Sequence, residues 1–190
     1  MFKKLASVPE DPAWIRRAAT CLLRGPAFQA SLYRGPSRKA RTSEGRRILD
    51  VLSLLKQDHR TVSALLDEAT ACEPDDDRLN SLAEEIESAL TVHAAIEEKY
   101  FYPALRDRAE DSEDAVDVFE AYTEHELVKT LIALLKSGRQ PDEQFKAEVQ
   151  VLAENVKHHV KEEESTIFKL AREVLDDDEL EELGETMAVA

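Results

Sequence analysis

The chain has 190 residues, with 40 Asp or Glu against 25 Lys or Arg, and its formal net charge is −15. This charge argues against nucleic acid as a partner, because binding to nucleic acid depends on neutralising phosphates with Lys and Arg. No run of about 18 apolar residues is present, so we expect no membrane span. The two cysteines are too few for a disulfide framework or a thiolate zinc site, and they favour a reducing, cytoplasmic location.

The charge divides the chain into unequal parts. Residues 1–47 hold 11 Lys or Arg against 3 acidic residues, whereas residues 48–190 hold 14 against 37. We therefore predict a basic N-terminal extension or linker over 1–43, a main domain over 44–176 and a C-terminal helix or tail over 177–190. The extension is expected to form short helical pieces. Three roles stay open for it: an organellar import signal, a segment that docks on the acidic domain, and a site for a protein partner.

Four stretches beyond residue 43 carry apolar residues at helical spacing. They run from about 46 to 71, from 75 to Pro103, from 112 to 138 and from 142 onward, and a short fifth helix is expected from 177. The third stretch was identified by Val116, Phe119, Leu127, Leu131 and Leu134. Each long helix would span roughly 38 Å. Short connections between them predict an all-α, up-down-up-down four-helix bundle.

An internal repeat with an offset of 66 residues relates the two halves of this domain. In each half a His is followed, 34 positions later, by His-x-x-x-Glu. The residues that coincide are His59 with His125, His93 with His159, Glu97 with Glu163, Glu98 with Glu164, and Asp58 with Glu124. Because apolar neighbours follow the same offset, we expect two similar helical hairpins that pack as a pseudo-twofold bundle.

The repeated residues have the chemistry and spacing of metal ligands. Residues four apart on a helix lie on one face, so His93 and Glu97 can bind one metal together. Imidazole with carboxylate suits iron, manganese or zinc. Four His and two Glu are more than one metal needs, so we predict two metals bridged by both carboxylates, with a solvent oxo or hydroxo bridge and open positions for small ligands. The predicted ligands are His59, His93, Glu97, His125, His159 and Glu163.

The motifs Asp58-His59, His93 to Pro103, Glu124-His125-Glu126 and His159 to Glu164 resemble the hemerythrin HHE cation-binding domain. The resemblance covers about residues 46–172. It implies a four-helix bundle with a non-haem di-iron centre and thus iron as the metal. In that family the iron pair binds dioxygen as a peroxide, and some members sense oxygen, nitric oxide or iron.

One feature departs from the oxygen carriers of this family, which use five histidines, two of them four residues apart on the third helix. Here the positions four residues from His125 are Ala121 and Lys129. The chain therefore resembles the four-His, two-Glu variants. Our leading hypothesis is a di-iron protein that binds or senses dioxygen, nitric oxide or peroxide. The alternatives are a di-iron enzyme acting on peroxide or nitric oxide, and an iron-responsive regulator or iron store.

Two further residues lie next to predicted ligands, either in the sequence or on a shared helix face. His158 has Val92 as its repeat equivalent, so we expect it at the surface or beside the ligands. The alternative is that His158, paired with Glu162, is the ligand in place of His159. Tyr122 lies three residues before His125 and shares its helix face. It is proposed as a direct ligand or as a contact of one, against the alternative of an ordinary core tyrosine.

Overall fold

The computed structural model describes residues 50–109, 112–135 and 140–190. The predictions for residues 1–43, including short helices and import, lie outside the described residues, and the domain limits remain predictions. Within the described ranges the regular structure is helical throughout. No helix in these ranges is long and apolar enough to cross a membrane.

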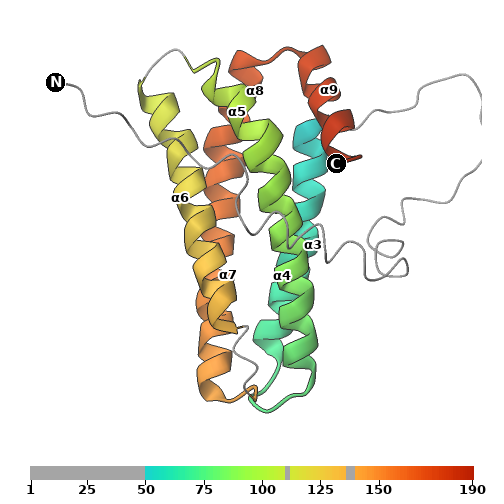
Figure 1. Ribbon diagram of the computed structural model, residues 1–190, viewed down its shortest axis with the longest axis vertical. Helices are drawn as coiled ribbons and strands as arrows, with labels where there is room; N and C mark the ends of the chain where they lie inside the picture. The colour runs from blue at the N-terminus through green and yellow to red at the C-terminus, as the bar shows by residue number, and fades with distance from the viewer. Residues whose placement is uncertain (1–49, 110–111, 136–139) are drawn as a thin grey trace, which may run out of the picture. The chain divides into compact units, whose positions relative to one another are not determined.

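Four long helices lie side by side and build the body of the domain (Figure 1). They are α3 (Val51–Ala71), α4 (Arg78–Ile96), α6 (Ser112–Leu135) and α7 (Glu143–Glu162). Helix α3 packs against α4 and α7, and α6 packs against both of these as well. Each helix therefore turns one side toward a common interior, as a helical bundle requires.

Two of the long helices continue through a π-helical turn. The turn η1 (Glu97–Phe101) follows α4 and leads into α5 (Tyr102–Arg106), and η2 (Glu163–Ile167) follows α7 and leads into α8 (Phe168–Val174). The sequence predicts that Pro103 kinks or ends the second helix. In the structure Pro103 sits in the first turn of α5, where a missing N–H is tolerated, and the irregularity is the π-turn just before it.

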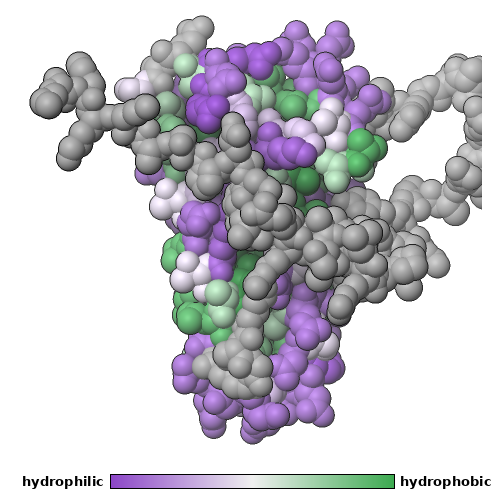
Figure 2. Space-filling model, in the orientation of Figure 1, coloured by the Kyte–Doolittle hydropathy of each residue, from purple (hydrophilic) through white to green (hydrophobic). Residues whose placement is uncertain are grey.

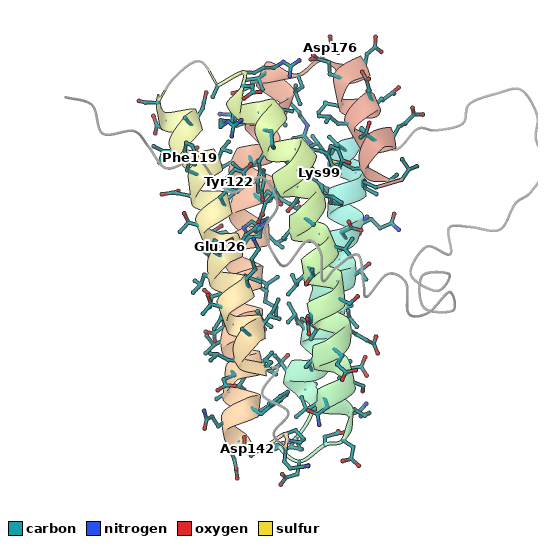
Figure 3. All side chains as sticks on the ribbon, viewed as in Figure 1. Lys99, Phe119, Tyr122, Glu126, Asp142 and Asp176 are labelled. Carbon is teal, nitrogen blue, oxygen red and sulfur yellow. The ribbon has the colours of Figure 1, made fainter. Side chains whose placement is uncertain are left out.

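Acidic side chains fix where helices begin. Asp50 accepts a hydrogen bond from the backbone N–H of Ser53 at the start of α3, and Asp142 accepts one from Phe145 at the start of α7. Asp176 forms a capping box with Glu179 at the start of α9 (Asp177–Met187). Figure 3 shows Asp142 and Asp176 at opposite ends of the domain. Helix α9, the expected fifth helix, packs against α3.

The apolar core consists of two clusters. One contains Leu55, Ile96 and Ala121 among others, and the second contains Val62, Leu90 and Val128. Along α3, α4 and α6, a histidine lies between the members of the two clusters. A polar layer therefore separates the two apolar clusters inside the bundle.

Helix α6 presents a different face to the core than the sequence indicated. Four of the five apolar residues that identified it are 48–55% exposed: Val116, Phe119, Leu127 and Leu134. Its buried positions include Val118, Ala121 and His125. Apolar residues occur on two sides of this helix, so the periodicity alone did not identify the buried side. Figure 2 shows hydrophobic surface on the side of the domain that α6 occupies.

Candidate metal centre

The polar layer contains all six predicted ligands. Each is at most 5% exposed: His59 on α3, His93 on α4, Glu97 at the start of η1, His125 on α6, His159 on α7 and Glu163 at the start of η2. Ionised Glu and His are costly to bury without partners. Side chains from four different helices meet in this one buried layer. A bound group that compensates for their burial is therefore required.

These six side chains form two clusters that are able to hold a metal ion. The first cluster is His59, His93, Glu97 and Glu163, and the second is Glu97, His125 and His159. Within each cluster one ligand atom per residue lies within 4.8 Å of all the others. Glu97 belongs to both clusters, as expected of a bridging carboxylate.

The distances between donor atoms suit a six-coordinate metal. His59 Nε2 lies 3.0 Å from Glu163 Oε2, and His93 Nε2 lies 3.2 Å from Glu97 Oε2. In the second cluster His125 Nε2 lies 3.1 Å from His159 Nε2. Donors about 2.1 Å from one metal and at right angles to each other are about 3 Å apart. The layer thus already has the spacing of neighbouring metal ligands.

Several of these atoms have no hydrogen bond within the described residues. They are His59 Nε2, both ring nitrogens of His93, Glu97 Oε1 and Glu163 Oε2. Buried polar atoms without partners are rare in folded proteins, and each requires an explanation. A cation bound between them would satisfy lone pairs on nitrogen and oxygen together. His59 Nε2 and Glu163 Oε2 are at ion-pair distance from each other but make no hydrogen bond, so the donor set fits a metal.

Three acidic residues, here called the outer carboxylates, hold the histidine rings. Glu164 lies 2.9 Å from Nδ1 of His59, Glu98 lies 2.9 Å from Nδ1 of His125, and Glu124 lies 2.8 Å from Nδ1 of His159. A carboxylate accepts the Nδ1 proton and so leaves Nε2 to face the interior as a ligand. This role is not evident from the sequence, although Glu98 and Glu164 are related by the 66-residue offset.

The fourth histidine, His93, has no outer carboxylate, although the repeat places Asp58 at the equivalent position. Glu124, which bonds His159, has Asp58 as its repeat equivalent. Nδ1 of His93, the equivalent of His159, has no hydrogen bond within the described residues. Burial raises the pKa of Asp58 to about 6, although the nearby His59 acts against this shift. The two halves of the layer are thus similar but not identical.

Lys129, the residue four positions after His125, contacts carboxylates and is not a candidate metal ligand. Its ammonium donates to Glu98 at 2.8 and 3.1 Å and to Glu126 at 2.7 Å. Burial acts to raise the pKa of Glu98, but the contacts with His125 and Lys129 outweigh it and lower that pKa. Lys129 therefore holds the outer carboxylate of His125 in its ionised form.

The tyrosine that reaches the layer is Tyr102 and not Tyr122. The hydroxyl of Tyr102 donates to Glu163 Oε1 at 2.9 Å and lies 3.3 Å from His125 Nε2. Tyr122, seen at mid-height on α6 in Figure 3, donates instead to the backbone carbonyl of Glu98 at 3.3 Å. The prediction of Tyr122 as a direct ligand is not supported by this contact, which is with the backbone of an outer carboxylate.

His158 lies at the surface, as one reading of its repeat position predicted. Its side chain is 64% exposed, and Nε2 lies 3.5 Å from Glu124 Oε1. The neighbouring His159 is buried and faces the interior. The histidine that the repeat register favours as a ligand is therefore the buried one of the two.

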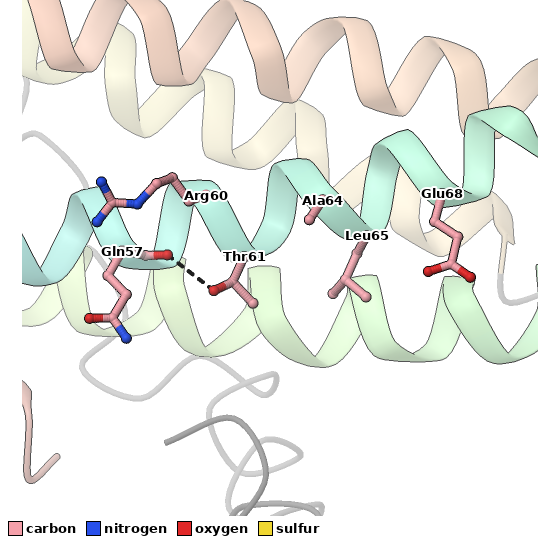
Figure 4. Close-up of a pocket in the computed structure, with 6 residues that line it drawn as sticks. All are labelled: Gln57, Arg60, Thr61, Ala64, Leu65 and Glu68. Carbon is pink, nitrogen blue, oxygen red and sulfur yellow. Dashed lines mark hydrogen bonds between the residues drawn. The ribbon is translucent and has the colours of Figure 1, made fainter. Parts of the chain in front are cut away.

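Two cavities lie at the surface of the described domain. One of about 330 Å³ lies between α6 and the α7–η2 segment, where His159 and Glu163 form part of its wall together with Glu120, Glu124 and Glu162. The other, of about 490 Å³, lies along α3 and is lined by Gln57, Arg60, Thr61, Ala64, Leu65 and Glu68 (Figure 4). Only the first is lined by predicted ligands, so it is the candidate route to the layer.

Protonation of the layer is set by burial and by contacts between its members. Burial acts to lower the pKa of His59, but Glu163, Glu97 and Glu164 outweigh it and raise that pKa to about 9. Burial and then the neighbouring Glu163 hold the pKa of Glu97 well above its usual range. Burial lowers the pKa of His93 well below its ordinary value. Without metal, His59 thus keeps its proton at neutral pH, and the pKa shifts of Glu97 and His93 favour the neutral form of each side chain.

We expect cation affinity to rise with pH between about 6.5, the ordinary pKa of histidine, and about 9, the pKa of His59. A metal must displace the proton on His59, and affinity changes by about tenfold per pH unit for each proton displaced. The metal-free protein should lose stability over the same range, because a group with a raised pKa stabilises the fold only while protonated. Zn²⁺ titrations with a pH indicator would measure proton release; affinity independent of pH would contradict this assignment.

Comparisons with known proteins agree with this geometry. The family model "Hemerythrin HHE cation binding domain" matches residues 50–171. A protein named DNA nickase from Nostoc sp. is 29% identical over 134 residues, which cover 70% of this chain but only 37% of that relative. A crystal structure of a hemerythrin HHE cation binding domain-containing protein from Mycobacterium kansasii is similar with a TM-score of 0.64 and 26% identity, covering 74% of this chain and 83% of that one.

Proposed function

Because this chain belongs to the hemerythrin HHE cation-binding domain family, we propose that its polar layer holds two iron ions and binds a small ligand such as dioxygen, nitric oxide or peroxide. His59 and His93 would hold one ion, and His125 and His159 the other. Glu97 and Glu163 would bridge them. The observation that carries this proposal is the pair of buried clusters sharing Glu97.

The surrounding residues prepare the site for this role. The bound iron pair would supply electrons and an open position to a small ligand. The outer carboxylates keep three imidazoles turned with Nε2 toward the interior. The two apolar clusters lie on either side of the layer. The cavity that leads to His159 admits cations and small neutral molecules more readily than anions, because acidic Glu120, Glu124 and Glu162 line it.

The proposal includes the duplicated, up-down-up-down organisation of the bundle. Two features around the polar layer support this organisation. The π-turns at Glu97–Phe101 and Glu163–Ile167 are 66 residues apart. The contact between His59 and Glu164 and the contact between His125 and Glu98 are related by the same offset. His125 is the repeat equivalent of His59, and Glu164 is the repeat equivalent of Glu98. A pseudo-twofold axis through the layer accounts for both observations.

An enzyme acting on peroxide or nitric oxide is the second candidate. The observation that favours it is the occupation of the two positions four residues from His125. Ala121 is 4% exposed and offers no donor, and Lys129 is bound to Glu98. Fewer protein ligands leave more positions for reaction. Repeated turnover with peroxide would favour the enzyme, whereas stoichiometric binding without turnover would favour the binding or sensing protein.

The name of the Nostoc relative does not lead us to propose DNA nicking here. This chain spans 37% of that protein's length. Residues 48–190 hold 14 Lys or Arg against 37 Asp or Glu, and such a surface repels phosphates.

Metal analysis of protein purified and reconstituted without oxygen tests the proposal. We expect about two irons per chain in the native protein and in the His158→Ala variant, whose residue is exposed. His93→Ala should hold less iron, because it removes one of the four donors of the first cluster. Zero or one iron in the native chain, or unchanged iron in His93→Ala, would contradict the proposed ligands.

A further inference from the structure

We propose that the residue at position 58 sets the affinity of one of the two metal positions. With Asp58 there, Nδ1 of His93 has no hydrogen bond within the described residues. The metal held by His59 and His93 is therefore bound less tightly than the metal held by His125 and His159. The inference rests on the proposed function, because it needs two metals. Position 58 acts on the metal only through the imidazole that it fails to hold.

The four imidazoles of the layer are not held alike. The rings of His59, His125 and His159 each have an outer carboxylate 2.8–2.9 Å from Nδ1. The ring of His93 is 5% exposed, and neither of its nitrogens has a hydrogen bond within the described residues. A carboxylate on Nδ1 fixes the orientation of the ring and makes Nε2 a stronger ligand, and loss of such a partner lowers metal affinity by about 10–100-fold.

Position 58 is the place from which a carboxylate would reach His93. In the second half of the domain, Glu124 on α6 contacts Nδ1 of His159 on α7. The 66-residue offset relates these two residues to Asp58 on α3 and His93 on α4. Helices α3 and α4 pack against each other, as α6 and α7 do. The same contact is thus expected between α3 and α4, and it is the one that is missing.

The length of the side chain accounts for the missing contact. Aspartate is shorter than glutamate by one carbon–carbon bond, about 1.5 Å. The carboxylate of Glu124 lies 2.8 Å from Nδ1 of His159. On a matching backbone, a carboxylate shortened by one bond lies outside the hydrogen-bonding range, which ends at about 3.2 Å. The bare Nδ1 of His93 therefore follows from Asp58 itself, and one added methylene group would supply the partner.

The number of metal donors does not reverse this difference. In the metal-free structure the first cluster has four candidate donors and the second has three. In the proposed centre, however, Glu97 and Glu163 both bridge, so each metal receives two imidazoles and two carboxylates. The two sets of imidazoles then differ in their outer carboxylates, which are present at both rings of one set and at one ring of the other.

Unequal affinity means that the two positions fill one after the other. The position of His125 and His159 fills at the lower concentration of free metal. The position of His59 and His93 fills at a concentration about 10–100-fold higher, if the outer carboxylate has its usual effect. One metal would then stay bound while the other exchanges with its surroundings. Such stepwise loading gives the iron-responsive alternative a physical basis, because occupancy changes with the supply of metal.

Competition titrations test the inference, with Zn²⁺ added to the metal-free protein in the presence of a chelator of known affinity. Asp58→Glu should strengthen the weaker of two binding steps by about 10–100-fold, and Glu124→Asp should weaken the stronger step by a similar factor. The matched control Asp67→Glu, which lengthens a 63% exposed side chain on the same helix, should change neither step. An unchanged weaker step in Asp58→Glu would overturn the inference alone, whereas fewer than two zinc ions in the native chain would overturn the proposed function with it.

Nuclear magnetic resonance of the zinc-loaded protein, labelled with ¹⁵N in its histidines, observes the contacts themselves. An imidazole N–H that donates to a carboxylate exchanges slowly with water and gives a separate proton signal. We expect three such signals in the native chain, from the rings that have outer carboxylates. Asp58→Glu should add a fourth signal, and Glu124→Asp should remove one. Four signals in the native chain, or no additional signal in Asp58→Glu, would overturn the inference.

Discussion

Glu97→Ala is expected to abolish the binding of both metal ions. Glu97 is 0% exposed and is the residue that belongs to both clusters. On the proposed function, its removal would take one donor from each metal and would also take away the bridge between them. Metal content should fall from about two ions per chain to near zero. Substitution of His93, which belongs to one cluster, should have the smaller effect.

The same variant should make the metal-free fold more stable. Without metal, Glu97 is a buried carboxyl whose Oε1 has no partner within the described residues, and burying such a group costs about 1–3 kcal/mol. Glu84→Ala, on the exposed side of α4, the helix that leads into Glu97, is the matched control and should change neither property. Two ions bound to Glu97→Ala would disprove the bridging role. A less stable metal-free variant would show that Glu97 serves the fold itself.

Removal of the metals from the native protein should lower its melting temperature by on the order of 10 °C. A ligand present at about 1,000 times its dissociation constant stabilises a fold by about 4 kcal/mol, and each kcal/mol shifts the melting temperature of a domain of this size by about 2–4 °C. The layer joins four helices, so the effect should extend to the whole described domain. Calorimetry with and without a chelator measures it.

The Glu97→Ala variant provides the control for this second experiment. Its melting temperature should not respond to the chelator. An equal response in both proteins would mean that the chelator acts elsewhere, and no response in the native chain would contradict a structural contribution of the metals. The same comparison tests the iron-responsive alternative, because a regulator of that kind needs a fold that depends on metal.

Local sequence signals determined much of the architecture. Asp142 and Asp176 cap helices close to where the sequence predicted helix starts, because capping depends on residues within one turn. The six predicted ligands meet in one buried layer. Their offset of 66 residues and the i, i+4 spacing are properties of the chain alone. The choice of His159 over His158 came from the same register.

Other features depended on contacts between helices. The buried side of α6 could not be identified from Val116, Phe119 and their neighbours, because apolar residues lie on two sides of that helix and only packing selects one. Outer carboxylates such as Glu98 and Glu124 look like ordinary surface acids in the sequence. Their partners His125 and His159 lie on other helices, so spacing along one helix does not identify the pairs.

The sequence by itself therefore determined a helical domain with a duplicated set of candidate metal ligands, since helix periodicity, caps and repeats are local properties. Tertiary structure decided which further residues surround that set. Tyr122 shared a helix face with His125, but it was Tyr102 that entered the layer. The π-turn after Glu97 rotates Tyr102 inward, and a regular α-helix, which is what the periodicity predicted, would have turned it away.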